Sequence, residues 1–162
     1  MEKIKSLYEQ REFKLNPIVV AIFIVALLGL VDASYLTIKH YSGGAVSCSV
    51  FEGCDAVASS KYSLLFGLIP VSLLGVVYYL TMMMFAVIYS FVVEKILVQG
   101  ATVISGLGFM ASLYFTYLQF FVIEALCMYC LFSAGTSTLL FLLTLFLIRN
   151  AKKVTISTEI TL

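Results

Sequence analysis

Four long apolar stretches dominate the chain, and short polar segments separate them. They cover residues 17–38, 64–93, 96–123 and 125–148. Each reaches the roughly 20 residues that an α-helix needs to cross the hydrocarbon core of a bilayer. The stretches are apolar on every face, whereas the strands of a membrane barrel would be short and would alternate apolar with polar residues. The pattern therefore predicts an all-α membrane protein, a bundle of four transmembrane helices.

The segments between and around these stretches predict how the chain is organised. The second stretch contains Gly67 and Pro70, which weaken or bend a helix, so we expect 64–69 to lie in the outer interface before the membrane-crossing part begins. The only substantial loop, 39–63, is predicted to face outward and to cap the bundle. We expect a cytoplasmic N-terminal segment at 1–16, one four-span domain at 17–148 and a cytoplasmic tail at 149–162.

Composition and charge support a membrane location and predict its orientation. Hydrophobic residues make up 62% of the chain and charged residues 12%, far from the balance of soluble proteins. The formal net charge of +1 gives no indication of a nucleic-acid partner. With four spans, only Lys39 and Lys61 fall opposite the two termini. The positive-inside rule then places both termini in the cytoplasm and the first and third connections outside the plasma membrane. The other eight of the ten basic residues lie on the side of the termini: Lys3, Lys5, Arg11, Lys14, Lys95, Arg149, Lys152 and Lys153.

All four cysteines fall on the outward side of this topology. Cys48 and Cys54 lie in the first loop, and Cys127 and Cys130 form a C-x-x-C at the start of the fourth span. Disulfides persist in oxidising compartments, which agrees with the orientation predicted from charge. The C-x-x-C spacing puts two sulfurs about one helical turn apart, and a helix N-terminus favours the thiolate of the first. Cys127 is therefore the predicted attacking thiol.

A cysteine pair on a loop beside a pair on a helix indicates an electron relay. The loop pair can reach a protein substrate and then exchange disulfides with the helical pair. Two other interpretations stay open at this point. Two inert structural disulfides are possible, although a C-x-x-C bridge closes a very small loop and adds little stability. A four-thiolate zinc site is also possible, although the loop pair lacks the usual close spacing, and we predict no metal.

These features resemble the vitamin K epoxide reductase family, especially its bacterial and archaeal branch. Residues 29–37, Gly-Leu-Val-Asp-Ala-Ser-Tyr-Leu-Thr, resemble the end of the family's first span. Cys48 and Cys54 resemble its loop pair, and Cys127-Met-Tyr-Cys130 resembles its redox motif. The segment that covers the family's quinone pocket is similar to residues 59–70 here, which include Ser59-Ser60, Phe66-Gly67 and Ile69-Pro70.

The resemblance implies a quinone-dependent thiol–disulfide oxidoreductase. Cys127 and Cys130 would be the active-site pair, with Cys130 nearest the quinone, and Cys48 and Cys54 would be the shuttle pair. The resemblance also implies that Ser60 and Phe66 contact the quinone, which would be menaquinone, ubiquinone or a similar molecule. We expect the enzyme to reoxidise a thioredoxin-like partner of the DsbA type and so to support disulfide formation in exported proteins.

Two other functions remain as alternatives. One is reduction of vitamin K quinone or epoxide in the narrow sense. The vertebrate members carry a Tyr one turn after the second cysteine of the motif, where this chain has Ala134, and this difference favours quinone over epoxide reduction. The other alternative is a small four-span transporter with structural disulfides and Asp32 as its coupling carboxylate. That function would leave all four cysteines without a task.

Asp32 near the outer end of the first span has two interpretations. Ionisable residues at membrane depth are often functional, and Asp32 could provide a proton route to the quinone. It could equally be an interfacial carboxylate held by Ser34, Tyr35 or a loop amide. We interpret His40, the only histidine, as a solvated side chain outside the mechanism.

Overall fold

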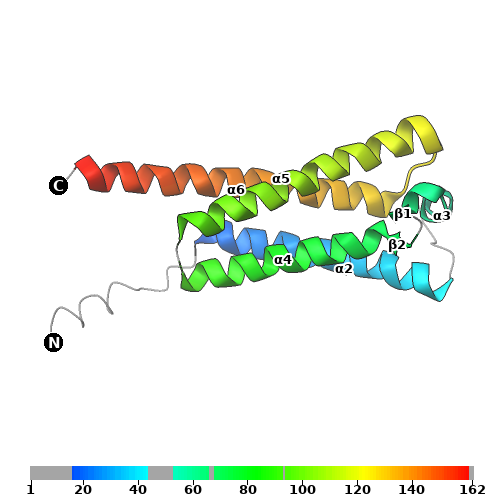
Figure 1. The fold of residues 1–162 in the computed structure, drawn as a ribbon, viewed down its shortest axis with the longest axis horizontal. Helices are drawn as coiled ribbons and strands as arrows, with labels where there is room; N and C mark the ends of the chain where they lie inside the picture. The colour runs from blue at the N-terminus through cyan, green and yellow to red at the C-terminus, as the bar shows by residue number, and fades with distance from the viewer. Residues whose placement is uncertain (1–15, 44–52, 66–67, 93, 161–162) are drawn as a thin grey trace.

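Four long helices run side by side in the computed structural model, which describes residues 16–43, 53–65, 68–92 and 94–160 (Figure 1). They are α2 (Pro17–Ser42), α4 (Val71–Phe91), α5 (Lys95–Leu118) and α6 (Met128–Ile160). A π-helical turn, η2 (Gln119–Ile123), continues α5, so the third apolar helix spans Ile96–Ile123. All four helices are long and apolar enough to cross a membrane. The predicted four-helix membrane bundle is therefore confirmed.

The first helix has clear start and stop signals. The Asn16 side chain accepts a hydrogen bond of 3.1 Å from the N–H of Ile18, and Pro17 occupies the first turn, where its missing N–H costs nothing. At the other end Gly43 adopts a left-handed φ of 62°, which glycine tolerates best. The helix therefore continues one turn beyond residue 38, where the apolar stretch ends, and stops at the glycine.

The segment between α2 and α4 contains short elements. They are α3 (Cys54–Ala58), the 3₁₀ turn η1 (Lys61–Ser63), and two strands, β1 (Leu64–Leu65) and β2 (Ile69–Pro70), which pair antiparallel. Pro70 is extended and directly precedes α4, so the membrane-crossing helix begins after the proline, as we expected. The hairpin itself was not predicted, because two-residue strands carry no periodic signal. The predicted cap over the bundle involves residues 44–52, which lie outside the described residues, and it stays a prediction.

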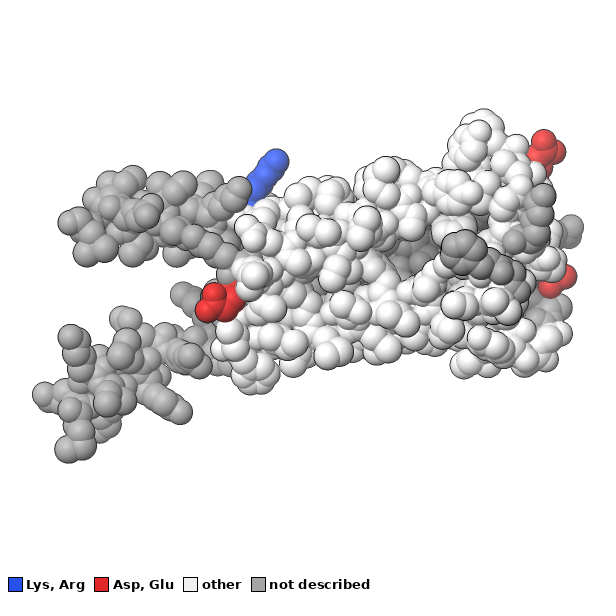
Figure 2. Space-filling model, in the orientation of Figure 1, with Lys and Arg blue, Asp and Glu red and all other residues white. Residues whose placement is uncertain are grey.

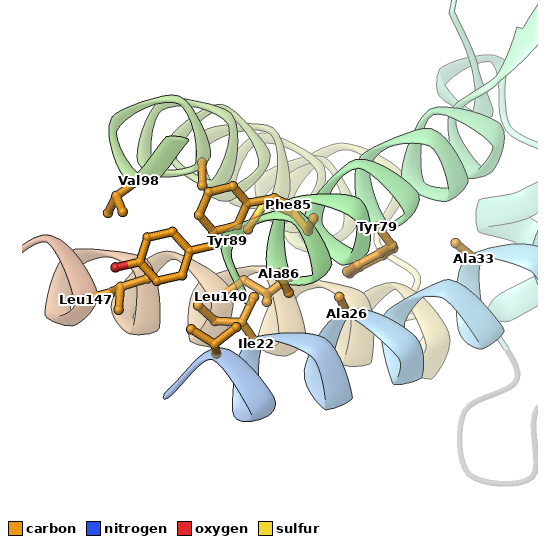
Figure 3. Close-up of a cluster of buried hydrophobic side chains, with 13 residues drawn as sticks. Ile22, Ala26, Ala33, Tyr79, Phe85, Ala86, Tyr89, Val98, Leu140 and Leu147 are labelled. Atoms are coloured by element: carbon orange, nitrogen blue, oxygen red, sulfur yellow. The ribbon is translucent and has the colours of Figure 1, made fainter. Parts of the chain in front are cut away.

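Helix packing creates a core that runs along the bundle. α2 packs against α4 and α6, and α5 packs against α6. Figure 3 shows buried side chains from all four helices meeting there, among them Ile22, Ala86, Val98 and Leu140. Large apolar side chains cover the outside of the same helices, as expected for surfaces in contact with lipid. Examples with high exposure are Ile24, Val31, Met84, Val103, Leu107, Met110, Leu142 and Phe146.

The two ends of the bundle differ in what they carry. The start of α2 and the end of α6 lie at one end, and α3, the β1/β2 hairpin and the start of α6 lie at the other (Figure 1). On the face seen in Figure 2, the coloured charged side chains sit at the two ends and the middle is uncharged. α6 runs on to Ile160, through the residues we assigned to the tail. Cys54 begins α3, and Cys127 and Cys130 lie at the start of α6, so all three belong to this second end.

Gly29 lets α2 approach α4 closely, and replacing it tests this packing. A Cβ at Gly29 would overlap the ring of Tyr79, which is itself buried. We expect Gly29→Ala to lower the free energy of unfolding by about 1–3 kcal/mol, because overpacking forces side chains from their rotamers. The measurement is thermal unfolding in detergent. Gly100→Ala is the control, since nothing lies within 4 Å of a Cβ there. Equal destabilisation by both changes would contradict the close α2–α4 contact.

Candidate active site

The chain makes an unusual turn just before the C-x-x-C. The π-helical turn η2 ends at Glu124, whose φ is 55°, and it is the only non-glycine residue with positive φ among those the structure describes. A bulky residue in the left-handed region is strained, and π-turns often occur at functional sites. The turn reverses the chain between α5 and α6 and delivers Cys127 to the end of the bundle.

Gln119 fixes the backbone on the far side of this turn. Its side chain is buried, and its Oε1 accepts a hydrogen bond of 2.9 Å from the N–H of Cys127. Its Nε2 donates to the carbonyl of Phe115 at 3.4 Å. We did not single out Gln119 from the sequence. The available signal was an amide side chain within a long apolar helix, a position where polar side chains commonly hold a membrane structure together.

Cys127 sits at the N-terminus of α6 and carries an activated thiol. Its carbonyl accepts a 3.0 Å hydrogen bond from the N–H of Leu131, which begins the helix, and both Cys127 and Cys130 are free. A hydrogen bond from Cys130 lowers the pKa of the Cys127 thiol from 9.0 to about 7, against the opposing effect of burial, and the N–H groups of Cys130 and Tyr129 add to the lowering. Unpaired N–H groups at a helix start stabilise a thiolate in this way.

The loop cysteine Cys54 lies close to this motif. Cys54 is disulfide-bonded, and its side chain is in one buried cluster with Cys127. α3 packs tightly here, because a Cβ at Gly53 would come within 2.8 Å of the backbone nitrogen of Leu126. Cys48 and Phe66 lie outside the described residues, so their predicted places are not described. Three of the four predicted redox cysteines are therefore brought together at one end of the bundle.

A cavity of about 590 Å³ opens beside the two free thiols. It lies between the four long helices, with residues of α3 and η1 at its wall, and its surface is mostly apolar. Ser60 lines it, and its hydroxyl donates to the carbonyl of Val57 at 2.8 Å. Ala134, one turn after Cys130, lines it as well. The size and the apolar surface are typical of small-ligand sites.

Few polar atoms face this cavity, and two of them have no partner. Asp32 Oδ2 and Tyr78 Oη are the buried side-chain oxygens without a hydrogen bond among the described residues, and both residues line the cavity. A planar quinone with two carbonyl oxygens and an apolar tail fits such a site. It matches the apolar surface and offers atoms to which the orphaned groups could bond.

The Tyr79 hydroxyl, by contrast, is well bonded and ties α4 to α6. It lies 2.9 Å from Ser133 Oγ and 2.7 Å from Thr136 Oγ1.

No group of three or more His, Cys, Asp or Glu side chains within the described segments could hold a metal ion.

A dithiol with one activated sulfur, set beside an apolar cavity in a membrane bundle, defines a membrane thiol oxidoreductase. The family comparison matches residues 20–145 to the vitamin K epoxide reductase family, and the chain belongs to that family. No curated protein matches the chain. The match covers most of the chain and includes all four cysteines, so the resemblance seen in the sequence is confirmed. The protein is accordingly a multi-pass membrane oxidoreductase of a quinone-associated family.

The low pKa of Cys127 can be tested through its neighbour. Below pH 7 the group is a thiol, and above it the reactive thiolate, so its alkylation rate should rise through a midpoint near pH 7. Cys130→Ala removes the largest cause of the lowering, and we expect the midpoint to move up toward 9.0. Cys130→Ser keeps a hydrogen-bond donor and should retain part of the shift. The measurement is iodoacetamide labelling against pH, with Cys127 followed by peptide mass spectrometry. An unchanged midpoint in Cys130→Ala would rule out this cause.

Proposed function

We propose that this protein is a thiol:quinone oxidoreductase that reoxidises a thioredoxin-like partner of the DsbA type and so supports disulfide formation in exported proteins. The observation that carries the proposal is the position of the Cys127–Cys130 dithiol. On one side Cys127 shares a buried cluster with the disulfide-bonded Cys54, and on the other side both thiols line the apolar cavity. A dithiol in this position can take electrons from a loop cysteine and pass them to an acceptor dissolved in lipid.

Electrons would enter through the loop pair, Cys48 and Cys54. A thiolate of the partner attacks the loop disulfide, and a second thiolate of the partner releases the partner in its oxidised form. One disulfide breaks and one forms, and the loop pair gains two electrons. A surface loop suits this step because binding residues are commonly carried on loops.

The loop pair would next reduce the C-x-x-C when the latter is oxidised. We assign the attack on Cys127 to Cys54, because these two side chains share one buried cluster. Cys130 is released first, and Cys48 then attacks Cys54 and releases Cys127. The pKa of Cys127, about 7, favours this last step, because a thiol of low pKa is a good leaving group.

The acceptor step would take place at the cavity. A bound quinone supplies an acceptor for two electrons and two protons. Cys130 lies in the first turn of α6 and lines the cavity, and we assign it as the thiol nearest the acceptor, as the family resemblance implies. Ser60 and Phe66 are proposed to contact the quinone. The cavity wall selects chiefly for an apolar molecule. The quinone used would therefore be the one that the organism's membrane supplies.

Orientation in the plasma membrane follows from the charge distribution. We propose that both termini are cytoplasmic, because eight of the ten basic residues fall on their side of the four spans. Cys54, Cys127 and Cys130 then face outward, where disulfides persist. The bacterial and archaeal branch of the family is the proposed branch. Ala134 on the cavity wall, in place of a tyrosine, favours quinone over epoxide reduction.

Cysteine variants test this function with purified protein in lipid nanodiscs. With dithiothreitol and a soluble quinone analogue, we expect wild-type protein to form quinol. Cys127→Ala and Cys130→Ala should each lower the rate by at least about a hundredfold, because each removes one sulfur of the disulfide that must form. Cys54→Ala should keep much of the rate with dithiothreitol, which is small enough to reach Cys127–Cys130 directly, but lose it with a thioredoxin-like protein. If Cys130→Ala formed quinol at the wild-type rate, the proposal would be refuted.

A further inference from the structure

One carboxyl oxygen of Asp32, Oδ2, is buried and has no hydrogen-bond partner among the described residues. The side chain is only 8% exposed. We had considered a structural carboxylate held by Ser34, Tyr35 or a loop amide, but Oδ2 makes no such bond to a described residue. An unpartnered buried polar atom destabilises the folded protein, so its presence at this position points to a role.

The position of this carboxyl relates it to the redox chemistry. Asp32 lines the same cavity as Cys127 and Cys130, and it interacts electrostatically with both. It reaches this place because α2 lies tightly against α4, where a Cβ at Gly75 would be 3.3 Å from that of Ala33. This close contact at Ala33, the residue next to Asp32, holds α2 against α4 beside the cavity.

Tyr78 is the other orphaned group on the cavity wall, and it differs from Asp32 in two respects. Its ring lies against Gly108 on α5 and 5.0 Å from the ring of Tyr79, whereas Asp32 is electrostatically linked to both thiols. A phenol also exchanges protons less readily near neutral pH than a carboxyl does. Tyr78 is therefore suited to donating a hydrogen bond to a ligand, whereas Asp32 is suited to moving a proton.

We propose that the Asp32 carboxyl transfers a proton from the Cys130 thiol to a carbonyl oxygen of the quinone in the cavity. The inference rests on the proposed function and extends it by naming the residue that handles the proton. Cys48, Cys54 and the protein partner take no part in this step, so it concerns only the reaction of the reduced C-x-x-C with its acceptor.

Atoms and electrons balance in this scheme. The Cys127 thiolate and the Cys130 thiol lose two electrons together and form one S–S bond. The proton of Cys130 goes to Asp32, and Asp32 gives a proton to one quinone oxygen, so the carboxyl ends as it began. The second quinone oxygen takes its proton from water, which had received the proton of Cys127. The quinone gains two electrons and two protons and leaves as quinol.

Asp32→Asn keeps the size of the side chain and removes its ability to transfer a proton. Reduced protein is mixed rapidly with a soluble quinone analogue, and quinol formation is followed in a single turnover. We expect Asp32→Asn to be slower by about a hundredfold, the usual range for loss of a general acid or base, and Asp32→Glu to be less impaired. Asp55→Asn is the matched control, because Asp55 is an exposed carboxylate on α3 at the same end.

Two further measurements separate this inference from a loss of folding and from the proposed function. Thiol exchange between the loop pair and the C-x-x-C should be unchanged in Asp32→Asn. Infrared difference spectra of wild-type protein, with and without bound quinone, should contain a carboxyl band that Asp32→Asn lacks and Asp55→Asn keeps. A wild-type turnover rate in Asp32→Asn, or no such band, would overturn the role of Asp32. Failure of wild-type protein to form quinol would instead overturn the proposed function.

Discussion

The hydrogen bond between the N–H of Cys127 and the buried side chain of Gln119 holds the active-site segment in place. It spans the π-helical turn and the strained residue Glu124, and it sets where α6 begins. Because α6 begins directly after Cys127, the free N–H groups of its first turn stabilise the Cys127 thiolate. The same start leaves Cys127 against the loop cysteine Cys54 and Cys130 on the cavity wall. One polar contact thus places one sulfur against Cys54 and the other on the cavity wall.

In the core of a bilayer no water is present to bond to polar groups, so a polar side chain of this bundle that has no partner points to a ligand site. Most hydroxyls within the spans bond to a backbone carbonyl one turn earlier or to a neighbouring helix, as Thr81 does with Val77 and Ser105 with Thr144. Such bonds satisfy polar atoms where water is absent. Against this background, the orphaned oxygens of Asp32 and Tyr78 stand out, and both face one cavity beside the dithiol. The cavity is therefore better explained as a ligand site than as a packing defect.

Much of the fold could be predicted from the sequence, because four apolar stretches leave no other membrane structure. Local signals at Pro17, Gly43 and Pro70 also agree with the observed helix boundaries. The β1/β2 hairpin and the role of Gln119 could not be predicted, since each depends on contacts that no periodic pattern records. For Asp32 the sequence left two interpretations, and its position on the cavity wall is the observation that supports the proposed role in proton transfer. The places predicted for Cys48 and Phe66 lie outside the described residues, and their roles stay predictions.

The central claim is that a quinone binds in the cavity beside Cys127 and Cys130. Photo-crosslinking with an azido-quinone, followed by peptide mapping, tests it most directly. The account predicts labelling of cavity residues of α4 and the first turns of α6, such as Ser133 and Ala134, and loss of that labelling when excess unmodified quinone is present. Labelling confined to lipid-facing residues such as Val103 or Met110, or labelling that excess quinone leaves unchanged, would contradict it.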